Sequence, residues 1–377
     1  MPEPLAGKQI VLGVTGGIAA YKAADLTSKL VQLGANVHVV LTQSALQFVQ
    51  PMTFQALTRN PVYSGVFDGW NGEDAGHVTL ASNADAVIVA PATANSIAKV
   101  AHGFAEDMPG SVLLATQAPI ILAPAMEHHM WHHPATQLNL ETLRDRGVIV
   151  VEPESGRLAS GASGDGRLAG IERILYATRC AVGKDGPLRG RKIVVTAGGT
   201  HEAIDPVRFI GNNSSGTMGI ALALAAADRG ADVKLIVGPT VANPPLGMDV
   251  VQVTSALELQ AAVDDAVVDA DVLIMAAAVA DFRPATTTNE KVKKTDDEDE
   301  WNLNLVKNPD ILASVQRDDL MKIGFAAETN DLIANAQSKL ERKGLAMIIA
   351  NDAVATIGSP DYTATILTRG EPSPEQL

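Results

Sequence analysis

The sequence is poor in cysteine and in aromatic residues. Cys180 is the only cysteine among 377 residues, which excludes an intramolecular disulfide framework and argues against a cysteine-based metal cage. Aromatic residues make up 4% of the chain and hydrophobic residues 46%, so we expect cores built from Ala, Val, Leu and Ile. Such cores are typical of α/β proteins.

Basic residues are also scarce. Lys and Arg number 29 against 43 Asp and Glu, and the formal net charge of −14 disfavours nonspecific binding to nucleic acid or to anionic membrane surfaces. Any anionic substrate must therefore be held by local groups. The acidic run at 295–300 is interpreted as a solvated loop.

Long apolar runs and a secretory leader are absent as well. No run reaches membrane-spanning length, and the first residues lack the basic and apolar segments of a signal peptide. Together with the single cysteine, this predicts a cytoplasmic protein. A chain of 377 residues corresponds to about two or three domains, so a fusion is expected.

Two parts of the chain repeat one order of elements: an apolar run, a glycine turn, a helix-like stretch and a second apolar run. These elements lie at 9–14, 15–17, 19–33 and 37–41, and again at 192–196, 197–200, 219–229 and 233–237. Further apolar runs, which suit parallel strands covered on both faces, lie at 86–90, 119–123, 148–151, 272–277, 323–326 and 347–350. The sequence therefore predicts two Rossmann-like three-layer α/β domains with mainly parallel sheets.

The boundary between these domains is predicted in a segment rich in glycine and charge. Residues 182–190 are interpreted as a linker between domains at 1–181 and 191–377. A second glycine-rich stretch, GRLASGASGDGR at 156–167, is predicted to be a mobile flap rather than a packed element. It contains Ser160, a candidate for chemistry.

Glycine turns before helices are candidate phosphate sites, because helix N-termini present free N–H groups. Gly16-Gly17 and Gly198-Gly199 both qualify, although neither matches a dinucleotide or Walker fingerprint. Residues 208–219 gather Arg208, amides, hydroxyls and glycines before a helix, which suits an anionic ligand or, alternatively, an elaborate helix cap.

Several motifs occur in a common order. After residue 190 they are TAGGT (196–200), IDPVR (204–208), NNSSGTMG (212–219), AAAVAD (276–281), KVKK (291–294), KNPD (307–310) and GFAAE (324–328). Before it they are VTGGIAAYK (14–22), TQS (42–44), His77, PATAN (91–95), PAM (124–126) and the glycine-rich stretch. Over about residues 6–352 the chain resembles the bifunctional family in which phosphopantothenoylcysteine decarboxylase is fused to phosphopantothenate–cysteine ligase, in coenzyme A biosynthesis.

For the second half, the resemblance implies a ligase that activates 4′-phosphopantothenate with CTP, so that cysteine attacks an acyl cytidylate. It implies Lys291 at the transition state, Asn212 at the acyl intermediate and Arg208 as a substrate contact. The nucleotide positions are Gly198, Gly199, Thr200, Ala277, Asp281, Lys291, Lys307, Asn308, Pro309, Asp310, Phe325, Lys339 and Lys343. Mg²⁺ is expected on the triphosphate, without a dedicated carboxylate cage.

For the first half, the resemblance implies a flavodoxin-like decarboxylase in which FMN oxidises the substrate thiol and so provides an electron sink for decarboxylation. His77 matches the catalytic histidine. The positions implied for FMN are Gly16, Gly17, Thr42, Ser44, Pro91, Ala92 and Thr93.

The chain departs from the family pattern at two catalytic positions. Ser160 stands where the family has a cysteine that completes the reductive step, and Glu127 stands where it has an asparagine near the substrate carboxylate. An ionised Glu127 repels that carboxylate, whereas a neutral one can hydrogen-bond it. Two alternatives follow: the first half stops at the enethiol or only binds FMN as a regulatory module, or Glu127 and Ser160 form a substitute proton-donating pair.

Other departures lie in the second half. His201, Asn213 and Thr217 stand where more basic or different residues are expected, and the chain ends at Leu377 before a last helical segment. A nicotinamide-dependent reductase is a further alternative, but the dinucleotide fingerprint is missing.

Four histidines follow Glu127. His128 with His132, and His129 with His133, are i,i+4 pairs that could bind Zn²⁺ if the segment is helical. Because the same segment matches the family's substrate clamp, no metal site is predicted. The partners implied are the small-molecule substrates and further copies of the chain, with trimeric decarboxylase and dimeric ligase contacts, and no nucleic acid or membrane.

Overall fold

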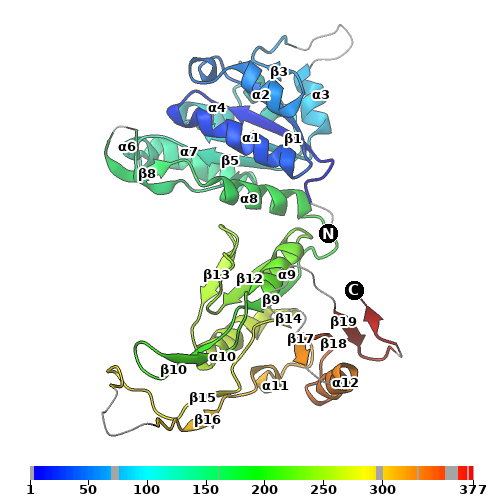
Figure 1. Ribbon diagram of the computed structural model, residues 1–377. Coiled ribbons are helices and arrows are strands. Elements are labelled where there is room, and N and C mark those ends of the chain that lie inside the picture. The colour runs from blue at the N-terminus through cyan, green and yellow to red at the C-terminus, as the bar shows by residue number, and fades with distance from the viewer. Residues whose placement is uncertain are drawn as a thin grey trace. The chain divides into compact units, whose positions relative to one another are not determined.

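The computed structural model describes residues 4–68, 76–159, 161–293, 300–328, 331–352, 364–371 and 373–376. The chain forms two compact units, Met1–Lys184 and Asp185–Leu377, each with its own sheet and helices (Figure 1). Ser160 and residues 295–299 of the predicted acidic loop lie outside the described residues.

The first unit contains a six-stranded sheet whose neighbouring strands all pair in parallel. The strand order is β3 (Val62–Tyr63), β2 (Asn36–Leu41), β1 (Gln9–Val14), β4 (Ala86–Ala92), β5 (Ile120–Pro124) and β6 (Ile149–Val150). Its helices are α1 (Lys22–Gln32), α2 (Pro51–Thr58), α3 (Gly76–Asn83), α4 (Ala94–His102), α5 (Met108–Ala115), α6 (His128–Trp131), α7 (Pro134–Asp145) and α8 (Ile171–Gly183), with 3-10 turns η1 (Ile18–Tyr21) and η2 (Ala45–Gln47).

Successive residues of the central strands enter two different cores, which makes this unit three layers deep. Leu12 of β1 packs in a core with Leu26 of α1 and Ile174 of α8. Val11, its neighbour, packs in a second core that includes residues of α3, α4, α5 and α7. Strands covered on both faces explain why their sequences are apolar without alternation.

The second unit contains an eight-stranded sheet that is parallel except for its last two strands, β19 and β20. The order is β13 (Asp249–Gln252), β12 (Asp232–Val237), β9 (Lys192–Ala197), β14 (Val272–Met275), β17 (Met321–Glu328), β18 (Met347–Asp352), β19 (Thr365–Thr368) and β20 (Glu375–Gln376). The helices are α9 (Thr217–Ala227), α10 (Ala256–Ala266), α11 (Ile311–Ser314) and α12 (Leu332–Arg342), with the 3-10 turn η3 (Val267–Asp269).

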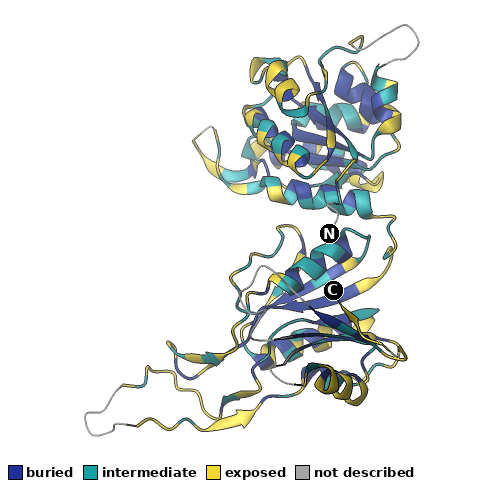
Figure 2. Ribbon diagram, turned by 45° about the vertical axis from the view of Figure 1, so that its right-hand side comes forward, coloured by how far each residue is buried: buried dark blue, intermediate teal, exposed yellow. Residues whose placement is uncertain are grey.

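A large core lies between this sheet and α10, α11 and α12, with Leu259, Ile311 and Leu340 among its members. The helix α9 packs on β9 and β12. Figure 2 shows the buried strands at the centre of each unit and the exposed outer faces of the helices. The predicted α/β architecture with mainly parallel sheets is confirmed.

Three two-stranded antiparallel sheets were not predicted. They are β7 (Glu154–Arg157) with β8 (Ser163–Arg167), β10 (His201–Ala203) with β11 (Phe209–Gly211), and β15 (Phe282–Pro284) with β16 (Leu305–Lys307). The prediction that residues 156–167 form no packed element was therefore wrong, because β7 and β8 pair within that stretch. Glycine and serine leave the backbone free to form this ladder, and side-chain composition alone did not reveal it. The helix α8 also continues into the first two residues of the predicted linker.

Candidate functional site

A cavity of about 820 Å³ lies in the second unit, where β14 and β17 end. Many residues predicted for the ligase line it, although they come from separate segments of the chain. They are Asn212, Ala277, Asp281, Lys307, Asn308, Pro309, Asp310, Phe325, Lys339 and Lys343. Ligands of doubly wound sheets bind at this carboxyl edge, where loops from neighbouring strands meet.

The cavity wall at 276–280 is fixed by two buried threonines. The Thr196 hydroxyl accepts a hydrogen bond from the Ala277 N–H at 3.1 Å, and the Thr200 hydroxyl accepts one from the Ala280 N–H at 3.0 Å. Thr200, predicted to contact the nucleotide, is buried and supports this loop from behind. Its hydroxyl satisfies the Ala280 N–H, for which the described contacts give no other partner.

Asn308 joins two parts of the same wall. Its amide donates to the Ala280 carbonyl at 2.8 Å, and its carbonyl oxygen accepts from the Arg283 guanidinium at 3.0 Å. The Asn308 side chain is buried, so these bonds set its orientation. Asn212, an exposed residue that also lines the cavity, donates its amide to the Val279 carbonyl at 3.0 Å.

Basic side chains outnumber acidic ones around the cavity. Lys307, Lys339, Arg342 and Lys343 line it together with two carboxylates, Asp281 and Asp310. An excess of cations in a concave site favours a polyanionic ligand such as a nucleoside triphosphate. Arg342 was not predicted, although it lies next to Lys343.

Asp310 is the N-cap of α11 and is paired with Lys343. Partial burial acts to raise the pKa of the Asp310 carboxyl, but the hydrogen bond and positive charge of Lys343 outweigh it and hold the pKa below its ordinary value. The carboxylate is therefore ionised at neutral pH and neutralises part of the cationic cluster. A triphosphate entering the cavity would compete with it for Lys343.

Some predicted ligase residues do not line the cavity. They are Gly198, Gly199, Thr200, Arg208 and Lys291. Gly198 has φ +82°, and a side chain there would lie 2.7 Å from the Gly238 carbonyl oxygen, so the glycine is required by the packing of the turn. The turn that contains Gly198 supports the cavity wall but does not line the cavity.

Arg208 holds a loop rather than facing the cavity. Its guanidinium donates to the Val292 carbonyl at 3.0 Å, lies 3.4 Å from the Asp205 carboxylate and 5.2 Å from the centre of the Trp301 ring. Lys291, next to Val292, is exposed. Arg208, predicted to contact an anionic substrate group, makes these contacts within the chain and does not line the cavity.

A second cavity, of about 710 Å³, lies in the first unit. Gly17, Pro91 and Thr93 of the predicted flavin positions line it, together with Glu127. Most of the remaining wall is apolar, with Ile18, Ala94, Ala125, Met126, Met130 and Leu168. Such a wall suits a planar aromatic ring.

The turn after β1 is tied to the end of β4. Thr15 donates its hydroxyl to the Pro91 carbonyl at 2.7 Å and accepts from the Thr93 N–H at 3.1 Å. At Gly16 an added side chain would lie 2.3 Å from Cβ of Ser44, so the turn and the loop after β2 are in close contact. Backbone packed this closely, with threonine and serine hydroxyls beside it, fits a phosphate-bearing ligand such as FMN.

Gly16, Thr42, Ser44 and Ala92 do not line this cavity. Ser44 lies against Gly16, whereas Thr42 and Ala92 are buried. The Thr42 hydroxyl accepts from the Ala45 N–H at 3.2 Å and so orders the loop after β2.

Three cations that had not been assigned roles also line the cavity: Lys22, Arg157 and Arg167. Burial, followed by the positive charge of Arg167, lowers the pKa of the Lys22 ammonium. Cations close enough to perturb one another attract an anionic ligand. The arginines flanking the glycine-rich stretch were a signal that sequence reasoning could have used.

Glu127 is the N-cap of α6. Its carboxylate accepts from the His129 N–H at 2.7 Å and lies 2.9 Å from Nδ1 of the His129 ring. The hydrogen bond with the His129 side chain lowers the pKa of Glu127. Of the two states considered for Glu127, the contacts favour the ionised one, which has no proton to donate.

His77, near the start of α3, does not line the cavity that contains Glu127. Its Nδ1 is buried and has no hydrogen-bond partner among the described residues. Thr93, by contrast, caps α4 by accepting from the Ser96 N–H at 3.3 Å and at the same time faces the cavity.

Helices in the described part of the chain lack the combination of length and apolar character that a membrane crossing requires.

Residues 1–182 match the family model described as flavoprotein, and residues 188–376 match the model of the DNA/pantothenate metabolism flavoprotein C-terminal domain.

Curated relatives align with almost the whole chain. The coenzyme A biosynthesis bifunctional protein CoaBC of Vibrio vulnificus is 46% identical over 354 residues, covering 93% of this chain and 88% of the relative. That of Bacillus subtilis is 46% identical over 356 residues, covering 93% and 87%. Among solved structures, a PPC decarboxylase mutant complexed with pantothenoylaminoethenethiol is 29% identical, covers 46% of this chain and 97% of that chain, and has a TM-score of 0.43.

Proposed function

The chain belongs to the family of bifunctional coenzyme A biosynthesis proteins CoaBC, and we propose that its second unit joins 4′-phosphopantothenate to cysteine with CTP, after which its first unit decarboxylates the product. The family membership supports both activities. One observation carries the ligase half: residues from separate segments converge on a cavity with an excess of basic side chains.

The ligase reaction needs positive charge where phosphate charge develops. A carboxylate is a poor electrophile, and transfer of a cytidylyl group from CTP converts it to a mixed anhydride while pyrophosphate leaves. Lys339 and Lys343 are proposed to hold the triphosphate, and Asn212 to hold the acyl intermediate. Mg²⁺ is proposed to bind through the phosphates. Asp281 is the carboxylate proposed to lie near it, because the described contacts pair the other cavity carboxylate, Asp310, with Lys343 and pair Asp281 with no cation.

In the first unit, the apolar wall and the turn at Gly16 are proposed to hold FMN, with Gly17, Pro91 and Thr93 beside it. When bound, the flavin supplies a two-electron oxidation and reduction of the substrate. Lys22, Arg157 and Arg167 are proposed to bind the anionic groups of the ligands. His77 is proposed to act as the catalytic histidine.

An assembly of several chains would explain the position of His77. His77 does not line the cavity of its own chain, and a site completed by a second copy would account for the role proposed for it. We propose trimeric contacts for the first unit and dimeric contacts for the second, in a cytoplasmic enzyme. A solution mass equal to one chain, measured by light scattering, would exclude sites shared between copies.

A second candidate function is an active ligase joined to a flavin-binding half that does not complete the decarboxylation. The ionised Glu127 favours it, because a fixed negative charge in the cavity repels the substrate carboxylate. It also argues against Glu127 and Ser160 as a proton-donating pair. If Ser160→Ala leaves turnover unchanged, that pair is ruled out.

The test is the mass of the products after the purified chain is incubated with 4′-phosphopantothenate, cysteine, CTP, Mg²⁺ and FMN. Formation of 4′-phosphopantetheine supports both halves. Accumulation of the cysteine adduct supports the second candidate, and absence of any adduct contradicts the ligase. A reaction without CTP is the control, and ATP in its place measures the nucleotide preference.

A further inference from the structure

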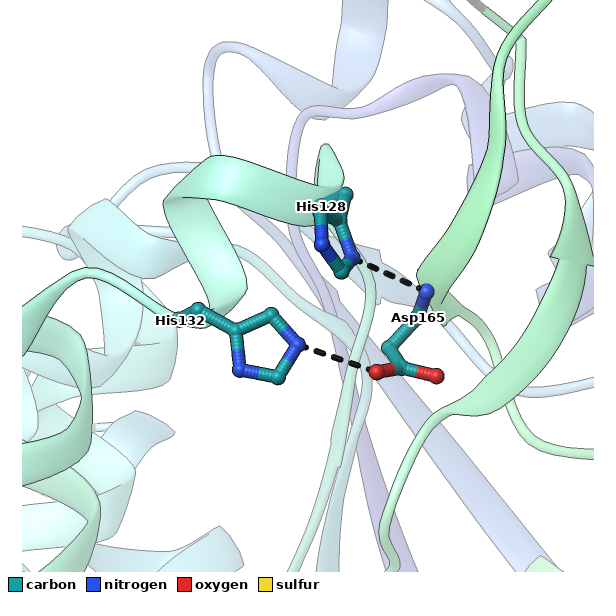
Figure 3. A group of neighbouring side chains, drawn as sticks. All are labelled: His128, His132 and Asp165. Atoms are coloured by element: carbon teal, nitrogen blue, oxygen red, sulfur yellow. Dashed lines mark hydrogen bonds and ion pairs between the residues drawn. The ribbon is translucent and has the colours of Figure 1, made fainter.

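A group of metal-ligating side chains lies beside the first-unit cavity and has no part in the proposed decarboxylation. It consists of His128, at the start of α6, His132, one helical turn later, and Asp165 in β8 (Figure 3). Each side chain offers one ligand atom, and the three atoms lie within 4.8 Å of one another. Among the described residues, no other group of three or more His, Cys, Asp or Glu side chains brings its ligand atoms this close together.

Hydrogen bonds and close packing join these groups to one another. Nε2 of His132 lies 2.9 Å from the Asp165 carboxylate, and Nδ1 of His128 accepts from the Asp165 N–H at 3.1 Å (Figure 3). The Ser155 hydroxyl donates to the other carboxylate oxygen. At Gly164 an added side chain would lie 2.8 Å from Nδ1 of His128, so β8 lies directly against the imidazole.

We propose that His128, His132 and Asp165 form a binding site for a divalent transition-metal cation of the Zn²⁺, Co²⁺ or Ni²⁺ class. Two imidazoles and one carboxylate are the ligand types that these metals take, and solvent can complete the coordination because His132 is exposed. The cation would replace the proton between His132 and Asp165. It would also take the lone pair that His128 now shares with the Asp165 N–H.

Magnesium and calcium fit this group less well, because they prefer oxygen ligands and only one carboxylate is present. The Ser155 contact would orient that carboxylate, as outer hydrogen bonds do in other metal sites. Bidentate binding by Asp165 would require this contact to break.

A bound cation would join α6 to the strand pair β7–β8. Both elements border the cavity: Glu127 precedes α6, and Gly166 of β8 accepts the Met126 N–H at 2.9 Å. In this structure hydrogen bonds join α6 and its C-cap His132 to β8. Metal bonds would make β7–β8 less mobile and slow its local opening.

The experiment is a titration of the full-length chain, without a polyhistidine tag, with Co²⁺ under reducing conditions. We expect visible d–d absorption that saturates at one cation per chain and is abolished by Zn²⁺. His132→Asn and Asp165→Asn should each weaken Co²⁺ binding about tenfold or more, since each removes a ligand. The matched control is His133→Asn, which changes an adjacent histidine outside the group and keeps a residue that can cap α7.

Trypsin cleavage after the exposed Arg157 at the end of β7 provides a second measurement. Zn²⁺ should slow this cleavage several-fold in the unaltered chain and in His133→Asn, but not in His132→Asn. Absence of saturable Co²⁺ absorption in the unaltered chain overturns the proposal. So does equal binding by the unaltered chain and His132→Asn, once circular dichroism has shown that the variant is folded.

Discussion

The Lys343 ammonium lies 2.9 Å from each oxygen of the Asp310 carboxylate. Lys343 follows the last residue of α12 and Asp310 caps α11, so this pair joins two segments that are far apart in the sequence. Both residues face the second-unit cavity. The pair keeps in place, and partly neutralises, the cation that we propose to bind phosphate, and an anionic ligand would replace the carboxylate.

Replacing Lys343 tests the role of this cation. Lys343→Gln should raise the KM for CTP about tenfold or more, because hydrogen bonds to charged groups contribute about 1.5–3 kcal/mol. Pyrophosphate release measures the change. Lys234→Gln, on β12 and outside the cavity, should leave the KM within about twofold, since exposed ion pairs contribute at most about 1 kcal/mol. Equal effects of the two substitutions would contradict the assignment.

The same pair predicts a pH dependence of stability. The pKa of Asp310 is lower in the folded chain than the ordinary value of about 3.9 in the unfolded chain. The pair therefore stabilises the fold above about pH 3.9, and this contribution is lost as the pH falls through the lower folded value. Because Asp310 is partly exposed, the contribution is at most about 1 kcal/mol.

Thermal unfolding of the unaltered chain and of Asp310→Asn from about pH 3 to pH 7 checks this sign. Asparagine can still accept the Ala313 N–H and cap α11, so the two proteins differ mainly in charge. The difference in Tm should be largest near neutral pH and should shrink as the pH falls below about 3.9. A difference that stays constant over the range would show that the ion pair is not its source.

Glu127 gives a prediction for the first unit. Glu127→Asn removes the negative charge but keeps a side chain that can cap α6. We expect the KM for 4′-phosphopantothenoylcysteine to fall roughly fivefold, because two unit charges about 4 Å apart in water repel by about 1 kcal/mol. The measurement is CO₂ release in the presence of FMN. Glu106→Gln, which breaks a contact with Lys99 outside the cavity, is the control and should not lower the KM.

The two glycines of the first turn offer a matched pair. Gly16→Ala places Cβ 2.3 Å from Cβ of Ser44, whereas Gly17→Ala places Cβ 3.5 Å from the nearest side-chain atom, which is ordinary contact. Gly16→Ala should therefore weaken FMN binding about tenfold or more, and Gly17→Ala should change it much less. Flavin fluorescence titration measures both. Similar affinities would show that the close approach at Gly16 is unrelated to the cofactor.

Much of the fold could be predicted because its central strands are buried on both faces. The run at 9–14 coincides with β1, and the runs at 37–41 and 347–350 fall within β2 and β18. Burial on both faces requires continuous apolar residues, which a single sequence displays directly. The short pairs β7–β8 and β10–β11 carry no such pattern, since their pairing depends on backbone hydrogen bonds between separated segments.

Apolar patterning in the sequence predicts the two α/β units and shows which residue types are available at their sheet edges. Which of these residues meet depends on how the chain folds. The fold places Lys343 beside Asp310 and Asp165 beside His132. It also directs the Arg208 guanidinium to the Val292 carbonyl and places the Thr200 hydroxyl behind the cavity wall. The reason is physical: apolar periodicity records the burial of one residue at a time, whereas a polar contact depends on the position of a partner distant in the chain.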